Sequence, residues 1–216
     1  MRTDICAICN RENLILSRFW YIQLEDYMCG RYQFTTGSDD MSAAIVDMLD
    51  RRYPGEYKTG EIFPGDAAPA VISDGGRIVA VPAIFGFPGY QDGRLLINAR
   101  SETAAQKQTF SESLRERRIV LPASGFFEWS RDAKKTKYLF TVGGENLIYL
   151  CGIYKIIDGQ YRFAILTRDA NASMIETHDR MPIIIAKESV RAYLTERDTA
   201  MTLIDSASPL LDRTPA

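Results

Sequence analysis

Short runs of strand-forming residues, separated by clusters of glycine, aspartate and asparagine, constrain the fold of this chain most strongly. Runs of this kind, broken by turn residues, are typical of strands joined through hairpins. The runs lie at 78–84, 95–99, 119–122, 126–129, 138–142, 147–154 and 162–167. Because they do not alternate regularly with helices, the pattern predicts an α+β fold built on an antiparallel sheet or barrel.

Helical periodicity interrupts these runs in a few places. Over 42–53, Ile45, Met48 and Leu49 fall on one side of a predicted amphipathic helix, which Pro54 and the following glycine end. Further helices are predicted at 104–117, 170–177 and 187–196.

The organisation of the chain changes near residue 28. Residues 1–27 show no clear periodicity, whereas the pattern from 28 to 216 is regular and shows no internal boundary. We therefore expect one domain over 28–216, preceded by an N-terminal extension. The extension is either a removable leader or the product of a start codon assigned too far upstream, and the lack of a secretion-type signal favours the second.

Composition excludes several classes of protein. The formal net charge of −2 gives no global positive field for nucleic acid, and no apolar run is long enough to span a membrane. Cys6, Cys9, Cys29 and Cys151 do not form a disulfide pattern, so free thiols in a reducing cytoplasm are expected. With His178 as the sole histidine, four zinc ligands are hard to assemble, and we expect neither a metal nor a cofactor.

Polar residues embedded in apolar, strand-like surroundings are the candidate functional residues, because burial of such groups is costly unless they are paired or used. Cys29 precedes Gly30 and Arg31, and it is either a small buried residue beside a turn or a nucleophile. Asn98 stands where a strand leads into a helix, and it either caps the turn or serves a site. Arg100, in the structural alternative, pairs with the nearby Glu102.

Two later positions leave similar alternatives. Glu128 lies between Phe127 and Trp129, and strand alternation permits it to face solvent or a cleft. In a cleft, apolar neighbours would raise its pKa and make it a usable acid or base. His178 precedes a strand-like run, where a histidine is usually structural, yet it is the one imidazole available near neutral pH.

Taken together and in order, these segments resemble a known family. The motifs are Met-Cys-Gly-Arg-Tyr at 28–32, Asn-Ala-Arg-Ser-Glu-Thr at 98–103, Pro-Ala-Ser-Gly-Phe-Phe-Glu-Trp at 122–129 and His-Asp-Arg-Met-Pro at 178–182. They are similar to those of the SOS-response-associated peptidase family, also called abasic-site processing proteins. Two departures stand out, since Phe85 replaces the family's usual tryptophan and the cysteine is twenty-ninth instead of second.

The resemblance implies an α+β fold with an antiparallel, barrel-like core and peripheral helices. It also implies that Cys29 is the nucleophile, Asn98 the amide, Glu128 the acid/base and His178 the imidazole of a catalytic site. The implied partner is single-stranded DNA that contains abasic sites, met by a protein expected to be a cytoplasmic monomer, associated with the nucleoid when bound. The residues implied for DNA contact are Arg31, Phe85, Arg100 and Arg180.

The implied activity is covalent crosslinking to an abasic site as part of a DNA-damage (SOS) response. After removal of residues 1–28, the α-amine and thiol of Cys29 would close a thiazolidine ring on the abasic aldehyde, a lyase-type reaction with associated self-processing peptidase activity. Two alternatives stay open. One is a cysteine peptidase acting on other proteins, with Cys29, His178 and Asn98 in papain-like roles. The other is a non-catalytic module that binds single-stranded DNA.

Overall fold

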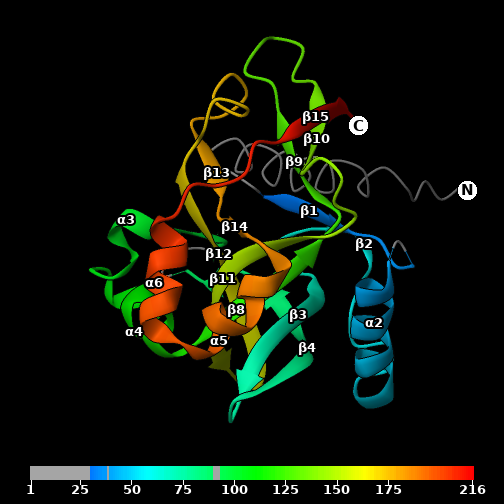
Figure 1. Ribbon diagram of the computed structural model, residues 1–216, viewed down its shortest axis with the longest axis vertical. Coiled ribbons are helices and arrows are strands. Elements are labelled where there is room, and N and C mark those ends of the chain that lie inside the picture. Colours follow the sequence, from blue (N-terminus) through cyan, green and yellow to red (C-terminus); the bar gives the residue numbers. More distant parts are fainter. Residues whose placement is uncertain (1–29, 38, 90–92) are drawn as a thin grey trace, which may run out of the picture.

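The computed structural model describes residues 30–37, 39–89 and 93–216, and Figure 1 shows how its helices and strands are arranged. The expectations for residues 1–27, Met28 and Cys29 fall outside these residues. The helices are α2 (Asp40–Arg52), α3 (Ser101–Ala104), α4 (Gln108–Glu116), α5 (Val190–Thr195) and α6 (Arg197–Asp205), with a short 3₁₀ helix, η1, at Lys187–Ser189. Strands and helices mixed in this way confirm the predicted α+β class.

The strands that the structure describes are assembled into a large and a smaller sheet, with one further short pair. The eight-stranded sheet contains β3 (Ala67–Asp74), β4 (Arg77–Phe85), β7 (Asn98–Arg100), β8 (Arg118–Ala123), β11 (Ile148–Ile157), β12 (Gln160–Asp169), β13 (Arg180–Pro182) and β14 (Ile184–Ile185). The five-stranded sheet follows the order β15 (Asp212–Pro215), β10 (Lys137–Thr141), β9 (Gly125–Trp129), β1 (Arg31–Phe34) and β2 (Gly60–Ile62). The short pair joins β5 (Phe87–Pro88) to β6 (Leu95–Leu96).

Strand β12 largely determines the shape of the larger sheet. It pairs with β11 on one side and with β4 on the other, so five strands are partly closed into a ring. The ring is not a clear barrel, because β13 and β14 continue beyond it and the smaller sheet lies outside it. The pairings of β12 with β4 and with β7 are parallel, so the antiparallel prediction holds for most but not all of the sheet.

Alternating side chains of the large sheet supply two apolar cores. Ile72 and Leu121 belong to the core that also receives Tyr32 and Phe126 from the smaller sheet. Val120, next in sequence to Leu121, belongs to the other core, which is closed by helices α2, α4, α5 and α6. This alternation is what a strand covered on both faces requires. The molecule is therefore layered, with the small sheet on one side of the large sheet and helices on the other.

Most predicted elements are confirmed, with shifts of a few residues at their ends. Helix α2 covers the predicted 42–53 segment, and its N-terminus is fixed by a capping box between Asp39 and Ser42. The predicted strand at 95–99 is divided into β6 and β7, and the predicted helix at 104–117 is divided into α3 and α4. Strand β3 was not predicted, because its sequence Ala-Ala-Pro-Ala-Val-Ile lacks alternation.

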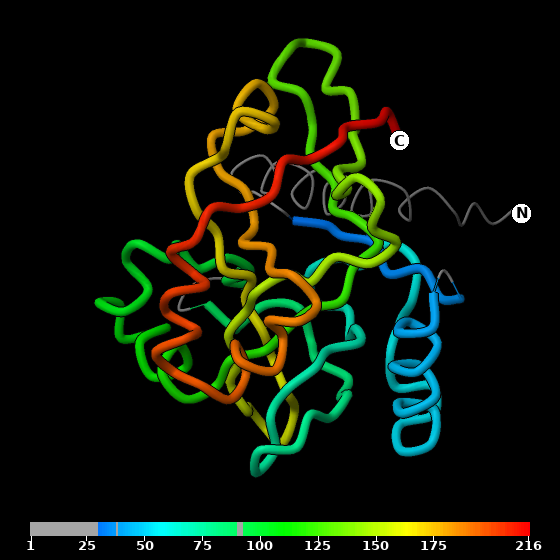
Figure 2. Tube along the Cα trace, in the orientation of Figure 1, coloured from blue at the N-terminus to red at the C-terminus, as the bar shows by residue number. Residues whose placement is uncertain are grey.

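The predicted helix at 170–177 is wrong. Consecutive turns occupy this segment instead, and the side chain of Asn171 explains the difference. Its Oδ1 accepts a hydrogen bond from the Ser173 N–H at 3.0 Å, and its Nδ2 donates to the Pro209 carbonyl at 2.8 Å. An asparagine side chain that bonds to nearby backbone in this way competes with helix formation. Figure 2 shows the C-terminal segment passing this loop before β15 joins the smaller sheet.

Candidate functional site

The N-terminal strand of the described chain is paired with the strand that carries Glu128. In the antiparallel register of β1 with β9, Arg31 lies opposite Phe127 and Tyr32 opposite Phe126. The same register, continued by one residue, places Gly30 beside Glu128. Gly30 itself is buried. The candidate nucleophile Cys29 immediately precedes Gly30 and lies outside the described residues.

Glu128 faces the interior, which settles the alternative left open by the sequence. Phe126, two residues earlier on β9, packs in the core with its ring 5.3 Å from that of Phe140. Because alternate residues of a strand share a face, Glu128 points the same way as Phe126. Glu128 is 5% exposed, and by the same alternation Phe127 and Trp129 lie on the opposite face of the sheet. A carboxylate held there can exchange protons away from bulk water.

Asn98 begins β7, which adds to the large sheet in parallel with β12. Asn98 lies opposite Ile165 and is partly buried, and Arg100 at the other end of β7 is exposed. The proposed pairing of Arg100 with Glu102 is not what the structure contains, because the partner of Glu102 is Arg180. Asn98 thus lies at the edge of the core, on a strand that β12 separates from β13.

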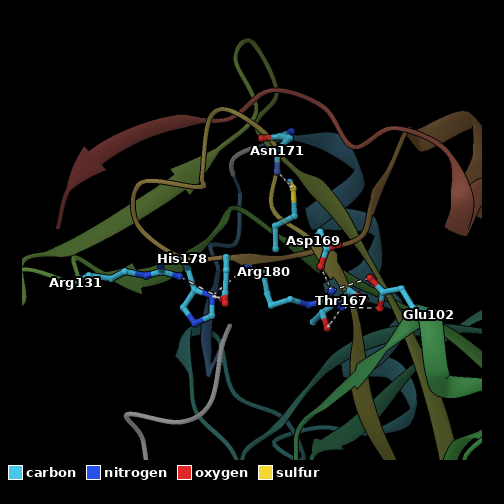
Figure 3. Close-up of polar contacts among 9 residues, drawn as sticks. Glu102, Arg131, Thr167, Asp169, Asn171, His178 and Arg180 are labelled. Atoms are coloured by element: carbon cyan, nitrogen blue, oxygen red, sulfur yellow. Dashed lines mark hydrogen bonds and ion pairs between the residues drawn. The ribbon is translucent and has the colours of Figure 1, made fainter.

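Arg180 joins the segment after Asn98 to the segment that contains His178. Its guanidinium donates to both carboxylate oxygens of Glu102, at 2.7 and 2.8 Å, and to the Thr167 carbonyl at 2.9 Å. It also pairs with Asp169, and Figure 3 shows the guanidinium enclosed by these groups. Hydrogen bonding from Arg180 holds the pKa of Glu102 below its usual range. The contacts fix β13 against β12 and α3.

His178 is partly buried, with 28% of its side chain exposed. Its Nδ1 accepts a hydrogen bond from the backbone N–H of Arg180 at 3.0 Å and lies 2.9 Å from a carboxylate oxygen of Asp179. One Nδ1 cannot accept the first bond and donate a second at once. Burial lowers the pKa of His178, and the neighbouring Arg131 and Arg180 lower it further, while Asp179 opposes this effect. We therefore assign a neutral imidazole that accepts at Nδ1 and carries its proton on Nε2.

This assignment predicts how His178 affects stability at different pH values. An unfolded histidine takes up a proton near its ordinary pKa of 6.5, whereas the folded one does so at lower pH. Between the two pKa values the unfolded state binds more protons, so the contribution of His178 to stability is present above about pH 6.5 and lost as the pH falls through the folded pKa. The free energy of unfolding in urea, measured from about pH 7.5 to pH 5, should fall more for the wild type than for His178→Gln. Equal pH slopes would contradict the neutral assignment.

The C-terminal strand links the loop of His178 to the hairpin of Glu128, a connection that sequence reasoning missed. Arg213, on β15, donates to the Thr177 hydroxyl at 3.0 Å, and its guanidinium lies 4.8 Å from the centre of the Tyr138 ring. Tyr138 is the cross-strand neighbour of Glu128 on β10. No local pattern in the sequence indicates this contact, because it joins residues 36 positions apart.

A second contact between the same loop and the β9–β10 hairpin comes from Arg131, which pairs with Asp179 at 3.3 Å (Figure 3). With the bridge through Arg180, the segments that carry Asn98, Glu128 and His178 are tied to one another.

The prediction that Phe85 contacts DNA needs correction. Its ring is fully buried, stacked on Phe163 at a centroid distance of 4.9 Å and packed edge-on against Tyr32 at 5.9 Å. Both ring faces lie in the core, so a nucleobase cannot stack there. Phe85 instead anchors β1 to β4 and β12.

Over the described residues, no helix is long and apolar enough to cross a membrane.

Comparison with known proteins identifies relatives over most of the chain. The model of the SOS response associated peptidase (SRAP) family matches residues 28–214. The abasic site processing protein YoaM of Bacillus subtilis is 30% identical over 195 residues, which cover 83% of this chain and 84% of YoaM. The abasic site processing protein YedK of Escherichia coli is 27% identical over 182 residues, covering 78% and 80% of the two chains.

Solved structures share the fold. A crystal structure of a protein from Bacteroides thetaiotaomicron superposes with a TM-score of 0.67 at 19% identity and covers 87% of this chain and 91% of its own. At this identity the similarity supports the architecture alone. The described fold therefore has experimental counterparts of nearly the same extent.

Proposed function

Because this chain belongs to the SOS response associated peptidase family, we propose that it processes abasic sites in single-stranded DNA by forming a covalent bond through Cys29. The observation that carries the proposal is the pairing of β1 with β9, which sets the residue after Cys29 beside the buried Glu128. Relatives named as abasic site processing proteins supply the substrate class.

The chemistry needs Cys29 at the start of the chain. Its free α-amine adds to the aldehyde carbon of an open abasic sugar, and loss of one water leaves an imine. The S–H bond then adds across the C=N bond, with sulfur joining carbon and the proton joining nitrogen. The product is a five-membered thiazolidine that links protein and DNA. An internal cysteine has no such amine, so the active form lacks residues 1–28. A terminal amine titrates near ~8, which leaves a useful neutral fraction in the cell.

Asn98, Glu128 and His178 assist this sequence. Asn98 holds the amine, and Glu128 moves protons while water adds and leaves. His178, neutral and with its proton on Nε2, acts at the sugar oxygen when the ring opens. The Glu128 carboxylate can accept and return protons, and the neutral imidazole of His178 can donate a hydrogen bond from Nε2 to the sugar oxygen.

Arginines are proposed to meet the DNA backbone. Arg31 and Arg100 lie on strands β1 and β7 next to the catalytic candidates, and Arg100 is exposed. Arg180 was also implied by its motif, but a phosphate would have to displace both Glu102 and Asp169 from its guanidinium. We therefore assign Arg180 to holding the site together. Single-stranded DNA is the expected substrate, because the sugar of an unpaired nucleotide is accessible.

The same residues offer a route to the free amine. The Cys29 thiol attacks the carbonyl carbon of Met28, the peptide nitrogen leaves as the Cys29 amine, and water then hydrolyses the thioester to release residues 1–28. Translation from Met28, followed by ordinary methionine removal, reaches the same N-terminus. Residues 28–216 are proposed to act as one domain and as a monomer, in the cytoplasm and on the nucleoid when DNA is bound.

A crosslinking assay tests the proposal. The 216-residue chain and a chain begun at Met28 are each mixed with a single-stranded oligonucleotide that carries one abasic site, and the products are separated on a denaturing gel. A shifted band is expected for the protein whose intact mass shows Cys29 as the first residue. The same oligonucleotide with an intact base should give none. Absence of a band from a verified Cys29 terminus would overturn the proposal.

A further inference from the structure

The face of the smaller sheet opposite Glu128 carries interleaved aromatic rings and cations, and of these residues the proposed function uses only Arg31. We call this surface the aromatic–cation face. It consists of Arg31, Glu61, Phe63, Phe127, Trp129 and Lys137. Strands β1, β2, β9 and β10 contribute five of these residues, and Phe63 directly follows β2; the four strands lie together in Figure 1.

Arg31 and Lys137 are held over rings of this face, and Lys58, which pairs with Asp66, also lies 4.8 Å from the centre of the Phe63 ring. The Arg31 guanidinium carbon lies 4.5 Å from the centre of the Phe63 ring and 4.9 Å from that of Trp129. The Lys137 Nζ lies 3.8 Å from the centre of the Phe127 ring. Contacts of this kind are attractive and keep the cation in place while its remaining donors stay available. Each cation is therefore positioned before any ligand arrives.

A single carboxylate connects the two cations. The Lys137 Nζ lies 2.8 Å from Oε1 and 2.9 Å from Oε2 of Glu61. The Arg31 Nη1 lies 3.4 Å from the same Glu61 Oε1. Charge-assisted bonds are normally about 2.7–2.9 Å, so Glu61 satisfies Lys137 well and Arg31 poorly. Within the described part of the chain, the buried Nε of Arg31 has no hydrogen-bond partner. The position is thus built for an anion that bridges both cations, and Glu61 fills it incompletely.

We propose that Arg31 and Lys137 form a phosphate subsite for single-stranded DNA, and that Glu61 is an internal counter-ion which a backbone phosphate displaces. This inference rests on the proposed function for the identity of the ligand. A phosphate offers more acceptor oxygens than a carboxylate and can reach both cations, while the rings of Phe63 and Trp129 hold the Arg31 guanidinium in place beneath it. Glu61 then weakens binding, because its charge must be moved aside and stays near the phosphate. Because the net charge of −2 provides no general attraction for DNA, the affinity for undamaged DNA depends on local cations such as these two and on the Glu61 carboxylate between them.

Binding of an undamaged fluorescent oligonucleotide to the full 216-residue chain tests this role without requiring crosslinking. Fluorescence anisotropy across a salt series should show roughly three- to tenfold tighter binding for Glu61→Gln than for the wild type at low salt. The matched control, Glu112→Gln, removes the same charge from helix α4, where Glu112 pairs with Arg117 at 3.1 Å, and should change affinity less than about twofold. Lys137→Met should weaken binding and reduce the salt slope by about one.

A double variant makes the test specific to the subsite. In the Lys137→Met background, Glu61→Gln should increase the affinity for the oligonucleotide much less, because one of the two cations that Glu61 neutralises is already absent. Unchanged or weaker binding by Glu61→Gln, an equal gain from the Glu112 control, or no binding of undamaged DNA by any variant would each overturn the inference. Since crosslinking is not read out, loss of the crosslink alone would count against the proposed function and leave this inference standing.

Discussion

Replacing Cys29 by alanine should abolish the stable protein–DNA complex while leaving a transient one. Alanine at the first position keeps the α-amine, which can still condense with the abasic aldehyde, but no thiol is present to close the ring. The variant should therefore give no band on a denaturing gel, and borohydride, which reduces an imine to a stable amine, should restore a band. The wild type should give its band without borohydride.

The matched control for this prediction is Cys151→Ala. Cys151 is fully buried on β11, and burial raises the pKa of its thiol, so it is not a competing nucleophile. This variant should crosslink as the wild type does. A stable band from Cys29→Ala, or loss of the band from Cys151→Ala in a folded protein, would show that the thiol has been assigned to the wrong residue.

Replacing Glu128 by glutamine should slow formation of the complex by about 100-fold, within the range that a positioned acid or base contributes. Glutamine keeps the size of the side chain in a site that is 5% exposed, so packing should change little. The amide cannot take up or release the proton that must move when water leaves the first adduct. The rate is best measured in a single turnover, with protein in excess over abasic DNA.

Glu145→Gln provides the comparison, because Glu145 is exposed in the turn before β11 and carries the same charge. Its rate should equal that of the wild type. If Glu128→Gln reacts as fast as Glu145→Gln, Glu128 is a structural residue and proton transfer comes from elsewhere.

The periodic parts of the fold could be predicted from the sequence because each depends on neighbours within one element. The apolar side of α2, set by Ile45 and Leu49, and the runs that became β4, β8, β9 and β12 are of this kind. The prediction for 170–177 failed because Asn171 bonds both to nearby Ser173 and to the C-terminal segment at Ser208 and Pro209. The bonds to the C-terminal segment join residues far apart in the chain, so no local pattern indicates them.

The site shows the same division. Motif order identified Asn98, Glu128 and His178 as candidates, but alternation alone could not say which face of β9 enters the core. That choice depends on Phe126 packing against Phe140 of the neighbouring strand. The partner of Glu102 is 78 residues away, and that of Glu61 is 76 residues away. Contacts over such separations depend on how the strands are paired in register, and no local pattern in the sequence indicates that pairing.

The intact mass of the purified protein–DNA complex tests the central claim most directly. If Cys29 forms the ring with its own amine and thiol, the mass must equal that of the chain from Cys29 to Ala216 plus that of the DNA, minus one water. Digestion of this complex should place the DNA on the N-terminal peptide, and borohydride should leave the finished complex unchanged. A complex whose protein part still contains residues 1–28, or whose DNA lies on a lysine, would contradict the account.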